Sequence, residues 1–286
     1  MQMNTEGFRC GFIAIIGRPN VGKSTLMNHL IKKKISITSR KSQTTRHLIR
    51  GIYTGQRAQF IFVDTPGFQT ASYPKFQATQ ETLKTVDCIL MVVEVLEFSK
   101  EERGIIDLLP KDVPVILVIN KVDQIRDKEK LAEFTKNCSA AYHFFAIQSV
   151  SAKHHQAIDS LKQSLQKTLP VSPPLYDTCT QTDQSERFLA SEIVQEKLFR
   201  YFSDEIPYRS RVIIEQFKKQ ETICHIYATI QVEKNSQKGI LIGKDGEKLK
   251  KIATESRVDM EKLFDTPVFL KIWVKTKAKK NDEAHE

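Results

Sequence analysis

The sequence predicts an α/β domain with a mostly parallel sheet, followed by a small α+β domain. Short apolar segments alternate with helix-like segments up to about residue 168, which is the order typical of a parallel sheet covered by helices. A Pro-rich stretch at residues 170–174 cannot continue a helix, and the order of elements changes after it. The expected boundaries are 8–170 for the first domain, 171–185 for a linker, 186–278 for the second domain and 279–286 for a disordered tail.

The elements follow from hydrophobic patterning. In the first domain, apolar runs predict strands at Phe12–Ile16, Ala58–Val63, Cys88–Val93, Val115–Ile119 and Phe144–Ile147, and helical spacing predicts helices at Thr25–Lys33 and His155–Thr168. In the second domain, we expect a helix at Glu186–Ser203, strands at Arg211–Phe217 and Thr222–Val232, a helix at Asp245–Phe264 and a strand at Val268–Val274. Two adjacent strands without an intervening helix favour an α+β arrangement.

Composition excludes several classes of protein. A hydrophobic fraction of 40% in 286 residues suits two globular domains. The longest apolar runs, Cys88–Val93 and Val113–Ile119, are far shorter than the roughly 20 residues of a membrane-spanning helix. The first residues lack a basic flank and an apolar run, so no cleaved signal peptide is expected. Five scattered cysteines without a Cys-x-x-Cys pair argue for a reducing compartment and against zinc or a disulfide framework.

The charge is unevenly distributed. The net charge is +10, and Lys234–Lys280 holds thirteen Lys or Arg against six Asp or Glu. This asymmetry suggests a nucleic-acid or anionic-membrane surface in the C-terminal part. For the Lys-rich run Lys275–Lys280, a solvated tail that keeps the protein soluble is the alternative.

The loop after the first expected strand fits the pattern G-x-x-x-x-G-K-[ST]. It reads Gly17-Arg18-Pro19-Asn20-Val21-Gly22-Lys23-Ser24 and is followed by Thr25. In such loops, backbone N–H groups and a helix N-terminus face the phosphates. Lys23 is expected to reach the β- and γ-phosphates, and Ser24 to bind Mg²⁺ through its hydroxyl. The sequence therefore predicts a bound nucleoside triphosphate with Mg²⁺.

A second phosphate-sensing motif follows the strand at Ala58–Val63. It reads Asp64-Thr65-Pro66-Gly67. Asp64 is expected to contact Mg²⁺ through a water, and the Gly67 N–H can reach the γ-phosphate. Phe68 occupies the position at which Ras-like proteins place a water-orienting glutamine. Because a phenyl ring cannot orient water, we expect intrinsic hydrolysis to be slow or to need help from another group.

Two further motifs predict that the base is guanine. Asn120-Lys121-Val122-Asp123 follows the buried strand Val115–Ile119. The Asp123 carboxylate can accept hydrogen bonds from guanine N1–H and N2–H₂, whereas adenine would leave it unpaired. The Lys121 stem can cover the base. A backbone N–H of Ser151-Ala152-Lys153 fits the contact to guanine O6.

Together these motifs resemble the GTPases of the translation-factor class, and more narrowly the Era family. The phosphate loop and Ser36–His47 carry the resemblance. It implies that Gln43, Thr44, Thr45, Arg46 and His47 form a switch segment, in which Thr45 binds Mg²⁺ and Thr44 is the alternative; from the residues alone, the segment is only a polar, basic loop. It also suggests that Asn20 ligates K⁺, which would supply positive charge at the phosphates. The alternative is that Asn20 only stabilises the loop.

The second domain carries a G-x-x-G loop. Ile242-Gly243-Lys244-Asp245-Gly246 precedes the long expected helix, and Lys248 adds to the basic surroundings. Such a loop is the signature of KH domains, which clamp about four nucleotides of single-stranded RNA. The order of elements fits the type II KH arrangement. Asp245 is expected either to lower RNA affinity or to cap the following helix. Trp273 is expected in the core rather than as an RNA-stacking platform.

The resemblance to the Era family extends over residues 8 to 277. It is carried in the second domain by Glu186–Ile193, Glu205–Tyr208, Asp265–Val268 and Trp273–Lys275. It implies a monomeric cytoplasmic switch that hydrolyses GTP to GDP and phosphate, takes no other small-molecule substrate, binds the 3′ end of 16S rRNA and assists 30S subunit maturation. It also implies peripheral association with the inner membrane. The alternatives are a P-loop kinase, against which Asn120–Asp123 argues, and a membrane-surface GTPase whose basic tail binds anionic lipid.

Overall fold

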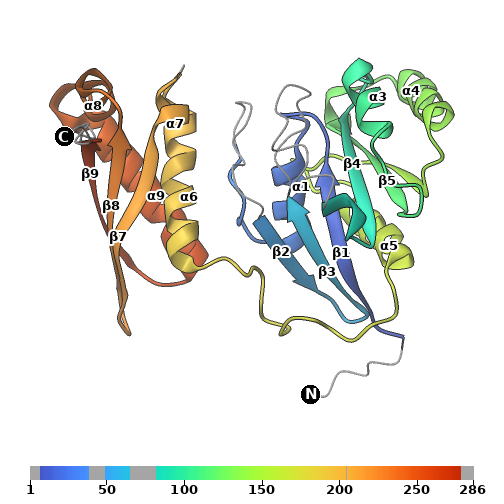
Figure 1. Cartoon of the computed structure of the whole chain (residues 1–286), viewed down its shortest axis with the longest axis horizontal. Coiled ribbons are helices and arrows are strands. Elements are labelled where there is room, and N and C mark those ends of the chain that lie inside the picture. The colour runs from blue at the N-terminus through green and yellow to red at the C-terminus, as the bar shows by residue number, and fades with distance from the viewer. Residues whose placement is uncertain (1–6, 39–48, 65–81, 204, 278–286) are drawn as a thin grey trace, which may run out of the picture. The chain divides into compact units, whose positions relative to one another are not determined.

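The computed structural model describes residues 7–38, 49–64, 82–203 and 205–277. The chain divides into two compact units, Met1–Asp183 and Gln184–Glu286. The first is an α/β unit and the second a small α+β unit, which confirms the predicted fold class (Figure 1).

In its described residues, the first unit holds a six-stranded sheet with strand order β2-β3-β1-β4-β5-β6. Only β2 is antiparallel to its neighbour. The strands are β1 Arg9–Ile16, β2 Ile49–Thr54, β3 Ala58–Asp64, β4 Cys88–Glu94, β5 Val115–Asn120 and β6 Ala146–Ser149. The helices are α1 Lys23–Ile31, α3 Lys100–Ile106, the 3₁₀ turn η1 Val122–Gln124, α4 Lys128–Ala141 and α5 Ile158–Thr168.

Burial on both faces explains the unbroken apolar runs of the central strands. Every residue of β3 and β5 is buried. One face of β1, β4 and β5 packs against Ile105 of α3 and Phe134 and Cys138 of α4. Helix α1 contacts β1, β2 and β3 as well as α5, and so covers the other face. Such a sheet places its ligand site at the carboxyl ends of the strands.

Several element boundaries differ from the predicted ones, and left-handed residues explain the differences at α1 and α5. Helix α1 ends at Ile31 because Lys32 adopts a left-handed conformation (φ 65°). Helix α5 begins at Ile158 rather than His155, because His155 and Ala157 have positive φ. The ladder of β6 with β5 begins at Ala146, two residues later than the aromatic residues suggested.

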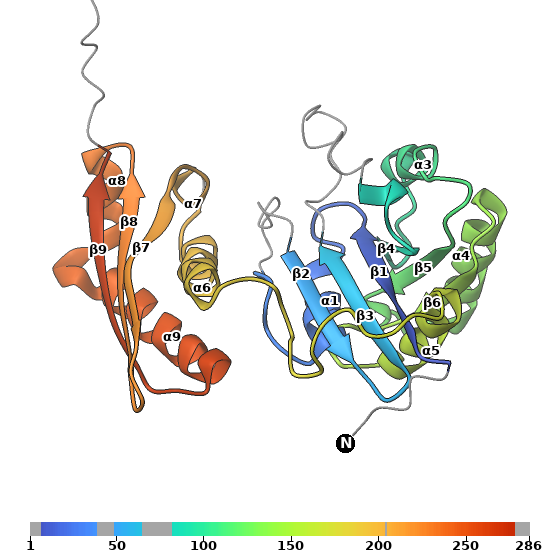
Figure 2. The ribbon, with the colours of Figure 1, turned by 60° about the horizontal axis from the view of Figure 1, so that its bottom comes forward.

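The second unit contains a three-stranded sheet with order β7-β8-β9 in its described residues. Strands β7 and β8 are antiparallel, and β8 and β9 are parallel. Helices α6 and α9 contact each other and pack against this sheet (Figure 2). The elements are α6 Glu186–Tyr201, α7 Ile206–Arg209, β7 Arg211–Lys219, β8 Cys224–Val232, α8 Asn235–Ile242, η2 Lys244–Gly246, α9 Glu247–Phe264 and β9 Val268–Thr276.

The prediction that Trp273 lies in the core is wrong. Side chains alternate along β9, so that Val268, Ile272 and Val274 are buried while Trp273 is 37% exposed. Trp273 shares its face of the strand with Lys271, which is exposed. Because successive side chains point to opposite faces of a sheet, the lysine spacing places Trp273 on the outer face.

Candidate functional site

The phosphate loop lies between β1 and α1 and is pressed against two other strands. Gly17 and Gly22 have positive φ (145° and 103°). A Cβ at Gly17 would lie 2.2 Å from the Val92 carbonyl oxygen, and one at Gly22 would lie 2.2 Å from Asn120 Nδ2. No side chain fits at either position, so both glycines are required for the loop to follow this path.

Lys23 is the first residue of α1 and its ammonium is buried. Nζ donates to the carbonyl oxygens of Gly17 (3.0 Å) and Arg18 (2.7 Å). Burial lowers the pKa of Lys23 to about 8, while Asp64 acts in the opposite direction. Because burial of a cation is unfavourable without a compensating charge, a bound phosphate would stabilise Lys23 in its charged form.

Oxygen atoms of three side chains converge at the end of β3. The Ser24 hydroxyl donates to Asp64 Oδ2 (2.7 Å), and the Ser36 hydroxyl donates to the same oxygen (2.9 Å). Asp64 is fully buried. Hydroxyl and carboxylate oxygens are the ligands that Mg²⁺ prefers, so Ser24 and Asp64 fit the predicted metal. The hydrogen bond from Ser36 to Asp64 was not predicted, since no motif distinguishes Ser36 from other polar residues of its loop.

The structure brings together the two motifs expected to bind the base. Asn120 Nδ2 donates to the Val21 carbonyl oxygen (2.8 Å), and the Ala152 N–H donates to Asn120 Oδ1 (3.0 Å). Asn120 therefore connects the phosphate loop with residues 151–153. Lys121 adopts a left-handed conformation, and its Nζ lies 2.6 Å from Glu94 Oε2. Val122 begins the η1 turn.

The Asp123 carboxylate is held in its ionised form. The Ser151 hydroxyl donates to Oδ1, and His154 Nε2 lies 3.8 Å from Oδ2. The Ser151 hydrogen bond is the main reason why the pKa of Asp123 is lowered. An ionised carboxylate accepts hydrogen bonds and cannot donate them, which suits a base edge with two donors, such as guanine N1–H and N2–H₂.

The remaining residues of the phosphate loop differ in their surroundings. The Arg18 guanidinium pairs with Glu97 and the buried Glu102, so it braces the loop against the start of α3. Asn20 is exposed and has a φ of 66°, a conformation that asparagine tolerates better than most residues. Pro19 and Thr25 are half-buried.

Several predicted residues lie outside the part of the chain that the structure describes. These are the switch residues Gln43, Thr44, Thr45, Arg46 and His47, and the residues Thr65, Pro66, Gly67 and Phe68 that follow β3. The expected tail at 279–286 also lies outside it.

The G-x-x-G loop joins α8 to α9. Ile242 ends α8, and the η2 turn Lys244–Gly246 follows Gly243. Gly243 and Gly246 both have positive φ. Gly243 has φ 74° and ψ −179°, a combination open almost only to glycine. Lys244 and Lys248 are exposed. The loop therefore presents backbone and two cations to solvent, as a nucleic-acid clamp requires.

The expectation that Asp245 caps the following helix is wrong. The N-cap of α9 is Gly246, and no side chain there accepts a capping hydrogen bond. Asp245 itself has a φ of 51°. Aspartate is one of the few residues that adopt this left-handed conformation readily, which gives a structural reason for an acid at this position.

Comparison with known families agrees with the nucleotide motifs of the first unit and with the G-x-x-G loop of the second. Residues 12–121 match the family described as 50S ribosome-binding GTPase, and residues 205–281 match the KH domain family. The chain is therefore a P-loop GTPase that carries a KH domain.

Comparison with whole proteins identifies the family of GTPases to which the chain belongs. GTPase Era of Neisseria meningitidis serogroup A is 53% identical over 280 residues, which cover 96% of this chain and 91% of the relative. GTPase Era of Chromobacterium violaceum is 51% identical over 281 residues, with 96% and 95% covered. The chain belongs to the Era family of GTPases, and it is an enzyme that hydrolyses GTP.

Solved structures support the same conclusion. A crystal structure of Aquifex aeolicus Era bound to GDP·AlF₄⁻ has a TM-score of 0.88 and 32% identity, with 95% of each chain covered. The same values hold for Era in complex with MgGDPNP and nucleotides 1506–1542 of 16S ribosomal RNA.

Proposed function

We propose that this GTPase is a nucleotide-operated switch that binds the 3′ end of 16S rRNA and assists maturation of the 30S subunit. The observation that carries the proposal is that one chain combines an Asn120 and Asp123 arrangement that suits a guanine nucleotide with an exposed G-x-x-G loop. A similar Era protein holds MgGDPNP and nucleotides 1506–1542 of 16S rRNA in one crystal structure, which supports the pairing of these two ligands.

In the nucleotide site, each residue has a proposed role. Gly17–Thr25 hold the phosphates, with Lys23 at the β- and γ-phosphates. Ser24, Thr45 and Asp64, the last through a water, hold Mg²⁺. Asn120–Asp123 and Ser151–Lys153 bind guanine, and Thr65–Phe68 together with Gln43–His47 respond to the γ-phosphate. The convergence of Ser24 and Asp64 and the braced carboxylate of Asp123 support these assignments.

Hydrolysis is proposed to be slow unless charge is supplied to the phosphates. Phe68 offers no group that orients water. A cation at the phosphates stabilises the charge that develops during phosphoryl transfer. We assign this role to a K⁺ ion held by Asn20, whose side chain is exposed on the phosphate loop.

RNA is proposed to bind along Ile242–Gly246 and Lys248. The glycines let the sugar-phosphate backbone approach closely, and Lys244 and Lys248 supply positive charge. Residues 8–170 would then form the GTPase domain and 186–278 the RNA-binding domain, with 171–185 between them.

The cellular site of action stays a prediction. Within the described ranges, the structure contains no helix that is long and apolar enough to cross a membrane. We propose that the protein acts as a monomer in the cytoplasm, and that any contact with the inner membrane is peripheral.

Crosslinking in cells tests the proposed function. The GTP-bound protein is crosslinked to RNA, and the bound RNA is sequenced, beside a Lys244→Glu variant that reverses one charge on the exposed loop. We expect reads concentrated at the 3′ end of 16S rRNA, and their loss in the variant. Reads spread evenly over ribosomal RNA, or equal in both proteins, would contradict the proposal.

A further inference from the structure

The outer face of the second unit's sheet combines aromatic and basic side chains. The inner face is apolar, because Cys224, Ile226, Ala228 and Ile230 of β8 are buried beneath the helices. The register places different residues on the opposite face, which we name the aromatic face: Gln216 and Lys218 of β7, His225 and Tyr227 of β8, and Phe269, Lys271, Trp273 and Lys275 of β9.

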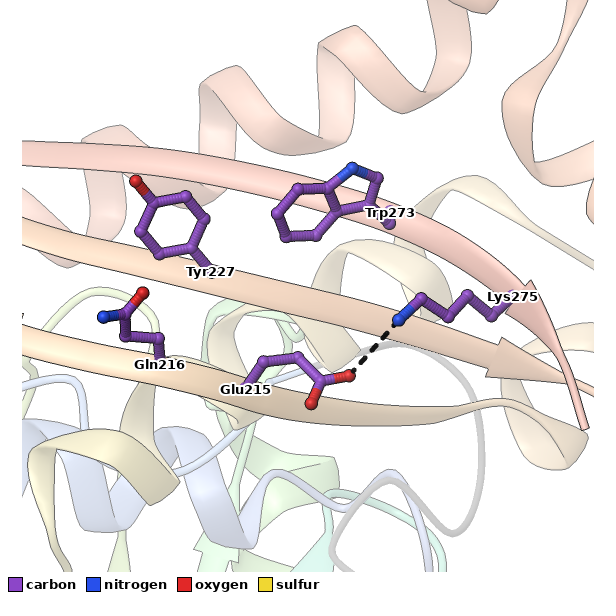
Figure 3. Close-up of a pocket in the computed structure, with 5 residues that line it drawn as sticks. All are labelled: Glu215, Gln216, Tyr227, Trp273 and Lys275. Atoms are coloured by element: carbon purple, nitrogen blue, oxygen red, sulfur yellow. Dashed lines mark ion pairs between the residues drawn. The ribbon is translucent and has the colours of Figure 1, made fainter.

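Two rings on this face form a flat surface. Tyr227 and Trp273 are diagonal neighbours on β8 and β9, with ring centroids 5.8 Å apart and planes inclined by only 15°. Figure 3 shows the two rings side by side over the strands. Lys271 Nζ lies 5.2 Å from the centroid of the Trp273 ring. The rings therefore provide a wide π surface, with the Lys271 ammonium over the Trp273 ring.

The same rings line an open hollow of about 790 Å³. Its other lining residues are polar: Gln216, Glu215 and Lys275. Lys275 Nζ lies 3.8 Å from Glu215 Oε1, as the dashed line in Figure 3 marks. An amide, a carboxylate and an ammonium thus surround an aromatic floor.

We propose that the aromatic face is a second RNA-binding surface, on which an unpaired base stacks against Tyr227 and Trp273. The inference rests on the proposed function, and it adds a contact separate from the G-x-x-G loop, since that loop leads into α9 on the inner face. A base has a π face for the two rings and polar edges for Gln216 and Glu215. Lys271 and Lys275 can meet the phosphates on either side of it. Stacking platforms flanked by cations bind single-stranded nucleic acid in this way.

The polar groups of the hollow favour RNA over a membrane. Aromatic and basic side chains also occur at membrane interfaces. Insertion of this face into lipid would carry the Glu215 carboxylate and the Gln216 amide toward an apolar phase, which is unfavourable for both groups. A nucleobase can instead form hydrogen bonds with these two side chains.

Trp273 offers a direct reporter, because it is the only tryptophan in the chain. The full chain is titrated with an RNA of nucleotides 1506–1542 of 16S rRNA while tryptophan emission and the anisotropy of labelled RNA are recorded. We expect quenching that saturates together with RNA binding. Trp273→Leu should weaken binding by about tenfold, from the usual contribution of one stacked base, whereas Trp273→Phe should bind nearly as the unaltered protein does.

Matched controls separate this inference from the proposed function. Phe145→Leu makes the same kind of change at an exposed aromatic residue of the first unit, and should leave RNA affinity unchanged. If Lys244→Glu abolishes binding while Trp273→Leu has no effect and emission does not change, the aromatic face plays no part and the proposed function stands. If the unaltered protein neither binds the RNA nor changes its emission, both ideas are contradicted.

Lipid vesicles test the alternative that the aromatic face binds a membrane. Mixed phosphatidylcholine and phosphatidylglycerol vesicles replace RNA in the same titration. We expect no change in Trp273 emission. A shift of the emission to shorter wavelength with vesicles, together with no quenching by RNA, would assign this face to a membrane and overturn the proposal.

Discussion

Replacing Asp123 by asparagine should remove the preference of the site for guanine. The carboxylate is braced by the Ser151 hydroxyl and lies 3.8 Å from His154, and its lowered pKa keeps it ionised. It can therefore accept from both donors of the guanine edge. An asparagine amide offers only one acceptor atom, and its NH₂ group would face a donor of the base.

The expected loss follows from two hydrogen bonds to a charged acceptor. Each contributes about 1.5–3 kcal/mol, so the loss of both weakens GTP binding by roughly 10²- to 10⁴-fold. Xanthine carries a carbonyl oxygen where guanine carries the N2 amine. The asparagine NH₂ can donate to that oxygen, so the variant should bind xanthosine triphosphate more tightly than GTP.

Isothermal titration of both nucleotides against the unaltered protein and Asp123→Asn measures this change. Ser151→Ala is the matched control, because it removes the neutral hydroxyl that braces Asp123 and keeps the carboxylate. It should weaken GTP binding only about two- to tenfold, the usual contribution of one such bond. If Asp123→Asn binds GTP within threefold of the unaltered protein, Asp123 does not recognise guanine and the reasoning fails.

Three further predictions address the loops and the buried lysine. The unaltered protein should hydrolyse GTP faster in K⁺ than in Na⁺. Asn20→Gly keeps the left-handed backbone (φ 66°) but removes the side-chain amide, so this difference in rate should disappear in the variant. Equal rates of the unaltered protein in both salts would refute a K⁺ site. Gly243→Ala should lower the free energy of unfolding by about 1–3 kcal/mol, because the φ and ψ of Gly243 suit only glycine. Gly246→Asn should change the free energy of unfolding little, because Gly246 has a φ of 76° and open space where a Cβ would lie. Equal effects of the two substitutions in thermal denaturation would contradict this prediction. The pKa of Lys23 is about 8 without nucleotide, and a bound phosphate should raise it. Affinity for GTP should therefore fall as pH rises through 8, and binding at pH 8 should take up about half a proton. Calorimetry in two buffers that shows no proton uptake would refute this prediction.

The grouping of the nucleotide motifs was predictable because each motif is a local signal in the sequence. Each motif directly follows an apolar strand, and parallel strands bring their carboxyl ends to one edge. The sequence therefore placed Gly17–Ser24, Asp64 and Asn120–Asp123 together. What it could not supply was the detail of contacts between distant residues, such as Ser36 on Asp64 and Arg18 on Glu102. Those contacts depend on how the loops fold back.

Several described elements were not predicted, among them a strand and a helix whose local signals are weak. Strand β2 (Ile49–Thr54) contains a glycine and lies at the edge of the sheet, where pairing with β3 decides its conformation. Helix α8 (Asn235–Ile242) has only eight residues and contains Gly239, which lowers its intrinsic helix propensity. Both form because tertiary packing stabilises them.

Trp273 was misplaced although the sequence held the relevant signal. Lys271 and Lys275 lie two residues on either side of it in a strand, so all three share one face. The prediction placed Trp273 in the core because its ring is apolar, and it did not use this spacing. The alternation along β9 shows that strand period decides which face a residue occupies, even for a large aromatic side chain.

The most direct test compares the RNA affinity of the two nucleotide states. The full chain is loaded with GDP or with a non-hydrolysable GTP analogue, and its affinity for nucleotides 1506–1542 of 16S rRNA is measured by fluorescence anisotropy. We predict tighter binding with the analogue, by the 5- to 150-fold that is roughly typical of coupled sites, and loss of binding in both states for Lys244→Glu. Equal affinities in the two states, unchanged by Lys244→Glu, would contradict a GTP-operated RNA switch.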